Sequence, residues 1–379
     1  MSAGEFSSVS RRSRGQGGSG GRANLVRRSV RSPFFPIWPA TVLLFAISPL
    51  IASGSLRPSA LASTMPFAAI LAIASIGQTL VIQQRGLDLA VPGTISLATI
   101  LITKYPNGSD SRLALGLVIV AVASVAVGLV SGFAVTQLRV TPLIATLGVN
   151  ALVLGTIEQV TGGSSTATPA PALSNFALGK TVGVPNTVLV AAGLVLLVAL
   201  FVRRTTIGRR FVAVGTSGAA AYVSGIPVRA YVFATYVVAG LSYGAAAVLL
   251  AGYVGTPGLS AGNNYLLPSI TAVVLGGASL AGGSGSVVGT AVGAVFLIQL
   301  QQDVFGAGAP TSVQYLIQAG VIGVAMAARN LRVRTAIADR LAATRGSAAP
   351  GRASGPAAPR EEREDGVPAG GGTSGATRT

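Results

Sequence analysis

The chain of 379 residues contains no cysteine and no histidine, and only 10% of its residues are charged. Disulfides, thiolate or imidazole metal sites, and catalytic pairs that need a histidine base are therefore excluded within this chain. Soluble domains carry about a quarter charged residues, so the shortage of charge also argues against a soluble domain. We predict no cofactor, no metal site and no catalytic residue, and hence a protein that is not itself an enzyme.

Apolar sequence is abundant instead, since half of the residues are hydrophobic and the mean hydropathy is +0.66. About ten segments approach the ~17–25 residues that cross ~30 Å of hydrocarbon. Unpaired backbone groups are too costly in lipid for open strands, so these segments predict an all-α, polytopic transmembrane bundle embedded in a lipid bilayer. The predicted segments are roughly 37–53, 64–82, 87–103, 113–137, 142–160, 186–202, 229–252, 266–282, 285–302 and 312–328.

The formal net charge of +17 comes from arginines that lie in blocks beside the apolar segments. This pattern is typical of membrane topology and does not predict a nucleic-acid partner. If the segments alternate, residues 1–32, Arg85, Arg139, the loop 203–229 and the region from Arg329 onward all fall on one side. That side is predicted to be the cytoplasm, with both termini inside.

Three zones follow from composition. Residues 1–32 are rich in Ser, Gly and Arg and predict a disordered, basic cytoplasmic tail. Residues 33–330 contain the apolar segments and predict the transmembrane domain. Residues 331–379 are rich in Gly, Ala and Pro near their end and predict a mostly disordered cytoplasmic tail.

The stretch QQRGLDLAVPG, Gln83 to Gly93, places an arginine and an aspartate in apolar surroundings. One interpretation is a boundary turn, where Arg reaches the interface and Asp88 caps a helix N-terminus. The second is a family signature. The run from Gly86 through Asp88 resembles the GIDLSV sequence of ribose-type ABC transporter permeases, with Ala90 and Pro92 as departures.

The loop from Thr205 to Ala230 resembles the cytoplasmic loop of the same permeases, with Ser217 in place of the usual Asn. Independently of the family, residues 218–224 predict a helix of about two turns that begins after Ser217 and ends before Gly225 and Pro227. So short a helix needs a partner surface; the alternative is an ordinary basic loop. The resemblance implies an ATPase-coupling loop, whose candidate residues are Gly215, Gly218, Ala220, Ala221, Ser224 and Gly225.

A third run, VVLGGASLAGGSGSVVGT, resembles the glycine-rich signature of this family. Its glycines predict a sharp turn between closely packed helices. The signature positions in this run are Gly276, Gly277, Gly282 and Gly283.

The three motifs occur in the family's order, and the resemblance spans about residues 40–330. It implies the permease subunit of an ATP-driven importer for a simple sugar such as a monosaccharide, located in the inner or plasma membrane. It also implies three protein partners: an ABC ATPase, an extracytoplasmic sugar-binding protein and a second permease subunit, identical or different. A permease for branched-chain amino acids or nucleosides is the nearest alternative, because these proteins share the topology.

Polar residues within the predicted spans give candidates for the translocation path. Glu158 is the one acid well inside a predicted span, and Gln78 and Asn150 are uncharged polar residues in others. Each could line a polar path or hydrogen-bond between helices. An ion-coupled secondary transporter would normally carry several ionisable residues at mid-membrane, which disfavours that class.

Overall fold

The computed structural model describes residues 36–164, 167–310, 312–321, 323–324 and 327. Both predicted tails, 1–32 and 331–379, lie outside these residues. Nearly all regular structure in the described residues is helical, which confirms the predicted all-α class. The exception is a hairpin of two-residue strands, β1 (Lys180–Thr181) and β2 (Val184–Pro185).

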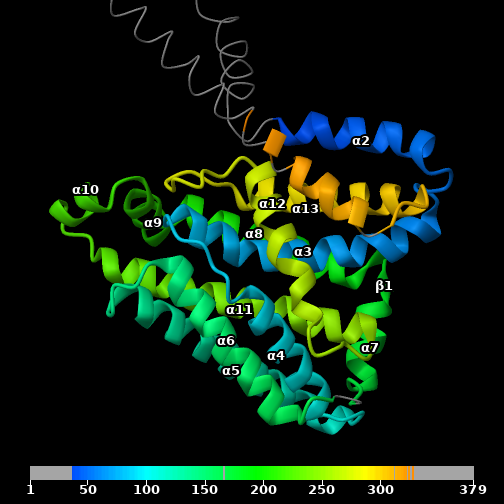
Figure 1. The fold of residues 1–379 in the computed structure, drawn as a ribbon, viewed down its shortest axis with the longest axis horizontal. Coiled ribbons are helices and arrows are strands. Elements are labelled where there is room, and N and C mark those ends of the chain that lie inside the picture. The colour runs from blue at the N-terminus through cyan, green and yellow to red at the C-terminus, as the bar shows by residue number, and fades with distance from the viewer. Residues whose placement is uncertain (1–35, 165–166, 311, 322, 325–326, 328–379) are drawn as a thin grey trace, which may run out of the picture. The chain divides into compact units, whose positions relative to one another are not determined.

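The helices follow one another along the chain as shown in Figure 1. They are α2 (Ile37–Ile51), α3 (Pro58–Gln83), α4 (Val91–Lys104), η1 (Asp110–Arg112), α5 (Leu113–Thr136), α6 (Pro142–Thr161), α7 (Pro171–Leu178), α8 (Asn186–Arg204), α9 (Thr206–Thr216), α10 (Gly218–Val223), α11 (Val228–Val254), η2 (Ala261–Tyr265), α12 (Leu266–Leu275) and α13 (Val287–Gly306). Residues 312–321 are also helical.

Six helices in the described residues are long and apolar enough to cross a membrane: α3, α5 with η1, α6, α8, α11 and α13. The helices α2 and α4 are apolar but shorter. The predicted span 266–282 contains only the ten residues of α12, because the chain turns after Leu275, where Gly277 adopts a φ of 86°. The number of ten crossings therefore stays a prediction.

The helices differ sharply in how much of them the protein itself covers. In α3, 89% of the apolar stretch is buried, against 22% in α5 and α8 and 28% in α6. Helix α3 is central and packs against α8, α11, α12 and α13. The outer helices instead expose leucines such as Leu152, Leu196 and Leu197. Exposed apolar surface on this scale fits helices whose outer faces contact lipid.

Small residues set the distance between α5 and α11. A Cβ at Gly240 would overlap the carbonyl oxygen of Ser124, and one at Gly128 would lie 2.5 Å from that of Tyr236. The two backbones therefore approach as closely as glycine allows, as membrane helices commonly do at small residues.

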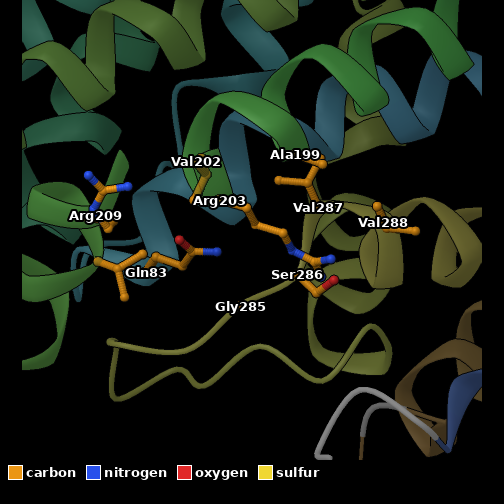
Figure 2. A pocket seen from close by; sticks show the side chains of 10 residues that line it. Gln83, Ala199, Val202, Arg203, Arg209, Gly285, Ser286, Val287 and Val288 are labelled. Atoms are coloured by element: carbon orange, nitrogen blue, oxygen red, sulfur yellow. The ribbon is translucent and has the colours of Figure 1, made fainter. Parts of the chain in front are cut away.

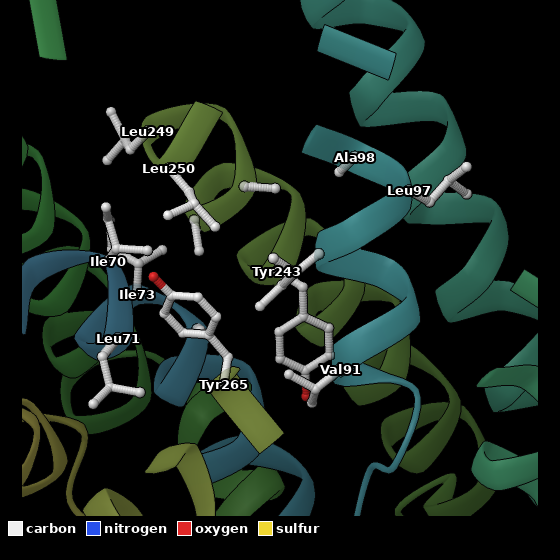
Figure 3. Packing of buried hydrophobic residues seen from close by; sticks show 14 of the residues in the cluster. Ile70, Leu71, Ile73, Val91, Leu97, Ala98, Tyr243, Leu249, Leu250 and Tyr265 are labelled. Atoms are coloured by element: carbon white, nitrogen blue, oxygen red, sulfur yellow. The ribbon is translucent and has the colours of Figure 1, made fainter. Parts of the chain in front are cut away.

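The core lies where α3, α4, α11 and η2 meet. Tyr243 of α11 faces Val91 at the start of α4, and Tyr265 of η2 lies beside Ile70 and Ile73 of α3 (Figure 3). These side chains are almost completely buried. The core therefore holds the start of α4 and the middle of α3 in a fixed relation to α11.

The two ends of the bundle differ in character. Helices α9 and α10 lie at one end, and α7 with β1 lies at the opposite end (Figure 1). Arg203 and Arg204 end α8, and Arg209 and Arg210 follow on α9, so we name this the basic end.

Candidate functional site

Three segments that are far apart in the sequence meet at the basic end: Gln83–Gly86 after α3, Gly215–Thr216 at the end of α9, and Gly282–Gly283 in the turn between α12 and α13. We name this meeting point the junction. The Gly283 amide donates to the Gln83 carbonyl at 2.9 Å. Each of the three sequence motifs contributes one of these segments, so the structure brings all three motifs together.

Arg85 ties two of these segments together. Its Nε donates to the Gly215 carbonyl at 3.1 Å, and its Nη2 donates to the Thr216 carbonyl at 2.5 Å. The neighbouring Gln84 side chain donates to the Phe211 carbonyl at 2.8 Å. The two hydrogen bonds of Arg85 thus satisfy carbonyls in the last turn of α9 that its own helix leaves free, and the Gln84 bond adds a further contact to α9.

The turn at Gly282 and Gly283, between α12 and α13, packs closely against Arg85 and the end of α9. Gly282 and Gly283 have φ of 85° and 76°, a conformation that side chains with a Cβ rarely adopt. A Cβ at Gly282 would overlap the Arg85 side chain, and one at Gly283 would lie 2.9 Å from the Thr216 Cα. Glycine is required at both positions for conformation and for space.

Asp88 lies just beyond the junction, between α3 and α4, and is only 3% exposed. Its Oδ1 accepts from the Ala90 amide at 2.9 Å, immediately before α4. This agrees with the predicted boundary turn, although the carboxyl is far more buried than a surface cap. Nearby Gly86 has no room for a side chain, because a Cβ there would lie 2.6 Å from the Tyr236 hydroxyl.

Helix α10 is the predicted short helix, and Ser217 is its N-cap as expected, accepting from the Ala220 amide at 3.3 Å. Gly225, with a φ of 77°, follows Ser224 and ends it. Ala221 is buried at 4% exposed, whereas Tyr222 and Val223 are 75% and 87% exposed.

The outward face of α10 was not foreseen from the sequence, because its six residues are too few for a helical period to be read. Of the predicted coupling residues, Ala220 and Ser224 are exposed, and Gly215 lies in the junction. Tyr222 and Val223 add an exposed apolar surface in a loop that otherwise carries arginines.

The predicted path residues are dispersed. Gln78 is fully buried and its Oε1 accepts from the Tyr243 hydroxyl at 3.2 Å. Asn150 accepts from the Gly93 amide at 2.8 Å and so holds α6 against α4. Glu158 is exposed on α6. The first two therefore form hydrogen bonds between helices, and no cavity described below includes any of the three.

A buried acid was missed by the sequence interpretation. Asp303 is completely buried in α13, where Oδ2 accepts from the Ser48 hydroxyl at 2.5 Å and Oδ1 accepts from the Gln299 amide at 2.9 Å. The ninth predicted segment ended at residue 302, which left Asp303 just outside it. The i, i+4 spacing of Gln299 and Asp303 was the available signal. This polar cluster joins α2 to α13.

A cavity of about 550 Å³ opens at the end of the bundle opposite the junction, between the first half of α3, the end of α11, η2 and the end of α13. We name it the glutamine cavity. Its polar lining includes Ser63, Thr64, Asn264, Gln301, Gln302 and Gln314. Phe67, Tyr265 and Phe305 supply aromatic surface, and none of the described lining residues is charged. Amides, hydroxyls and aromatic faces without charge suit a neutral solute that carries hydroxyl groups.

The hydrogen bonds of Arg85 give a direct test of the junction. In the Arg85→Ala variant, loss of bonds worth together about 1–2 kcal/mol is expected to raise amide hydrogen exchange in α9 and α10 roughly tenfold. Arg139→Ala is the matched control, since Arg139 also has a positive φ but is exposed and makes no side-chain hydrogen bond within the described residues. Equal exchange in the two variants would contradict the role given to Arg85.

An apolar helical bundle with arginines at one end and a short exposed helix among them defines a multi-pass membrane protein. The family of permeases described as "Branched-chain amino acid transport system / permease component" matches residues 60–326, and the chain belongs to this family. Its members are permease components of importers, so the chain is a transport subunit and not an enzyme. The predicted family is confirmed.

Individual relatives agree with this class. The chain is similar to the Autoinducer 2 import system permease protein LsrD of Photorhabdus laumondii, with 31% identity over 277 residues, which covers 72% of this chain and 83% of the relative. The proteins of the same name from Escherichia coli K12 and Shigella flexneri are 31% identical over 307 residues, covering 78% of this chain and 92% of theirs. No solved structure matches the chain.

Proposed function

We propose that the chain is the membrane-spanning permease of an ATP-driven ABC importer that moves a simple sugar, such as a monosaccharide, across the inner or plasma membrane. An extracytoplasmic binding protein delivers the sugar, and an ABC ATPase supplies the energy. A second permease subunit, identical or different, completes the path. The similarity to import permeases named for autoinducer 2 supports the importer class.

The observation that carries this proposal is the exposed surface of α10. Tyr222 and Val223 present apolar side chains from the basic end, where the positive-inside rule favours cytoplasm and not lipid. Such a surface needs a protein partner. The junction connects it through Arg85 to the segment after α3, so movement of α10 would reach the central helix of the bundle.

The proposed topology places the basic end in the cytoplasm and the glutamine cavity on the outer side. It requires both termini inside and an even number of crossings, for which ten is the proposed number. The shorter helices α2, α4 and α12, together with the helix that contains residues 312–321, would bring the six longer spans to ten. The outer position of the glutamine cavity then suits entry of a solute from a binding protein.

The chemistry of the glutamine cavity favours a sugar over the alternatives. A branched-chain amino acid, which the family description names, carries an ammonium and a carboxylate that call for charged or strongly dipolar partners. The lining of the glutamine cavity is uncharged, and its amides and hydroxyls match the donors and acceptors of a polyol. A nucleoside is the remaining alternative, because the aromatic residues would suit its base.

Uptake by membrane vesicles that contain the permease with its ATPase and binding protein tests the proposal. A radiolabelled monosaccharide that the binding protein accepts is expected to accumulate only with ATP, and to keep accumulating when an ionophore collapses the proton gradient at constant ATP. Loss of uptake on collapse alone would favour an ion-coupled transporter. Uptake of leucine in place of the sugar would overturn the substrate class while leaving the importer class intact.

A further inference from the structure

A second cavity, of about 310 Å³, lies at the basic end between the end of α8, the side of α9 and the start of α13. We name it the arginine cavity. Arg203 and Arg209 line it, and Figure 2 shows the Arg203 guanidinium above Ser286, with the Gln83 amide between the two arginines. Among the described residues, no acidic residue lines it. The cavity therefore gathers positive charge that no carboxylate within its walls neutralises.

Hydrogen-bond donors are available around this space. The Gln83 side chain is only 4% exposed, lines the cavity and makes no hydrogen bond within the described residues. Helix α13 begins at Val287, so the amides of Val287 and Val288 have no partner earlier in the helix, and its dipole adds positive potential. Because the Gln83 amide lines the cavity and has no hydrogen-bond partner among the described residues, its polar atoms are available to a ligand in the cavity.

The remaining wall is apolar. Ala199 and Val202 of α8 and Val212 of α9 complete the lining. The same α8 exposes Leu196, Leu197 and Leu200 on its outer surface, where lipid is the expected neighbour. The cavity thus lies where lipid-facing surface ends and the basic loop begins. A ligand that fits both parts has an anionic head and an apolar body.

We propose that the arginine cavity binds the phosphate headgroup of an anionic phospholipid from the adjacent leaflet. The phosphate accepts from Arg203, Arg209, Gln83 and the first amides of α13, while the acyl chains follow the outer face of α8. Arginine is well suited to this role, because its planar donors pair with phosphate oxygens in a bidentate manner. Inorganic phosphate shares the headgroup chemistry but would leave the apolar wall unused.

A lipid headgroup bound in the arginine cavity would affect the rest of the basic end. The bound headgroup would bridge α8, α9 and α13, and α9 continues directly into Gly215 and Thr216 of the junction. An anionic lipid would therefore restrain the loop that presents α10. This inference requires only that the chain lies in a membrane, and it is independent of the solute transported.

The test uses the full chain in nanodiscs made of phosphatidylcholine alone or with added phosphatidylglycerol. Lipid binding is measured by native mass spectrometry and by the shift in Tm. In the Arg203→Gln/Arg209→Gln variant, affinity for phosphatidylglycerol is expected to fall roughly tenfold or more, because two charge-assisted contacts are lost. The matched control is Arg204→Gln/Arg210→Gln, which removes the same charge from the same loop outside the cavity, and it is expected to retain binding.

A neutral substitution separates a built site from diffuse attraction. Gln83→Leu leaves the net charge unchanged and is expected to weaken phosphatidylglycerol binding several-fold, which general electrostatics would not do. Equal loss of binding in both double-arginine variants, or no effect of Gln83→Leu, would overturn the proposal. Full reproduction of the Tm shift by millimolar inorganic phosphate in phosphatidylcholine would also overturn it, in favour of a free-anion site.

Discussion

A negative charge at Val223 is expected to separate the permease from its ATPase without disturbing the membrane bundle. Val223 is 87% exposed at the end of α10, so Val223→Asp adds no strain to the isolated chain. Once docked, the carboxylate would be buried without a partner, which costs about 3–5 kcal/mol. Affinity for the ATPase should fall roughly a hundredfold or more. Co-purification of the two subunits, followed by ATP hydrolysis in proteoliposomes, measures this loss.

Thr206→Asp supplies the matched control for this result. It adds the same charge to the same loop, at the exposed first residue of α9, where a helix N-terminus favours an acid. Association with the ATPase should remain normal in this variant. If Val223→Asp also assembles and transports normally, the exposed surface of α10 does not dock on the ATPase. The family resemblance would then be the only support left for a coupling role of this loop. Ala221 is less suitable for the test, because it is buried and its substitution would disturb α10 itself.

The second large effect concerns the polar cluster between α2 and α13. Asp303→Ala removes an acceptor of the Ser48 hydroxyl and the nearer acceptor of the Gln299 amide, which keeps only the longer bond to Ser48 Oγ at 3.4 Å. A buried donor that loses its acceptor costs about 1–3 kcal/mol, and the space left behind adds to that cost. We expect the free energy of unfolding to fall by about 2–4 kcal/mol. Thermal unfolding in detergent, followed by intrinsic fluorescence, measures the change.

Asp303→Asn distinguishes hydrogen bonding from charge. Gln299 Oε1 has no partner among the described residues, so an asparagine amide at position 303 could donate to it while its carbonyl keeps an acceptor in place. This variant should unfold within about 1 kcal/mol of the natural protein. Glu158→Ala, which removes an exposed acid from α6, should change stability by no more than about 0.5 kcal/mol. A loss in Asp303→Asn as large as that in Asp303→Ala would mean that the carboxylate itself is required.

The helical bundle could be predicted from the sequence, because the length of each apolar segment can be compared directly with the thickness of the bilayer's hydrocarbon core. The predicted boundaries agree well for α5, α6, α8 and α11, whose first residues are, or directly follow, Arg112, Pro142, Asn186 and Pro227. The sequence was less informative near the glycine-rich turn. The sequence stays apolar past Leu275 as far as Ala281, so its hydropathy predicts a longer helix. In the structure α12 ends at Leu275, because Gly277 adopts a positive φ. A hydropathy profile does not reveal such a turn.

The three motifs of the candidate site could be predicted from the sequence, but their contact at the junction could not. Each of the three motifs was recognised separately, yet their meeting depends on Arg85 reaching Gly215 across 130 residues of chain. Side-chain hydrogen bonds to backbone carbonyls leave no pattern in a single sequence. The orientation of α10 was equally hidden, because burial of Ala221 beside exposed Tyr222 is set by tertiary packing.

The link between Ser48 and Asp303 also bears on the order in which the protein is built. The two residues are separated by 255 positions, and α13 is the main packing partner of α2. At a synthesis rate of about 5–20 residues per second, α2 emerges roughly ten to fifty seconds before Asp303 exists. During that interval the Ser48 hydroxyl has only the Leu44 carbonyl as its partner. The first described helix is therefore among the last to reach its final place, and a ribosome that stops before α13 leaves α2 without its main packing partner.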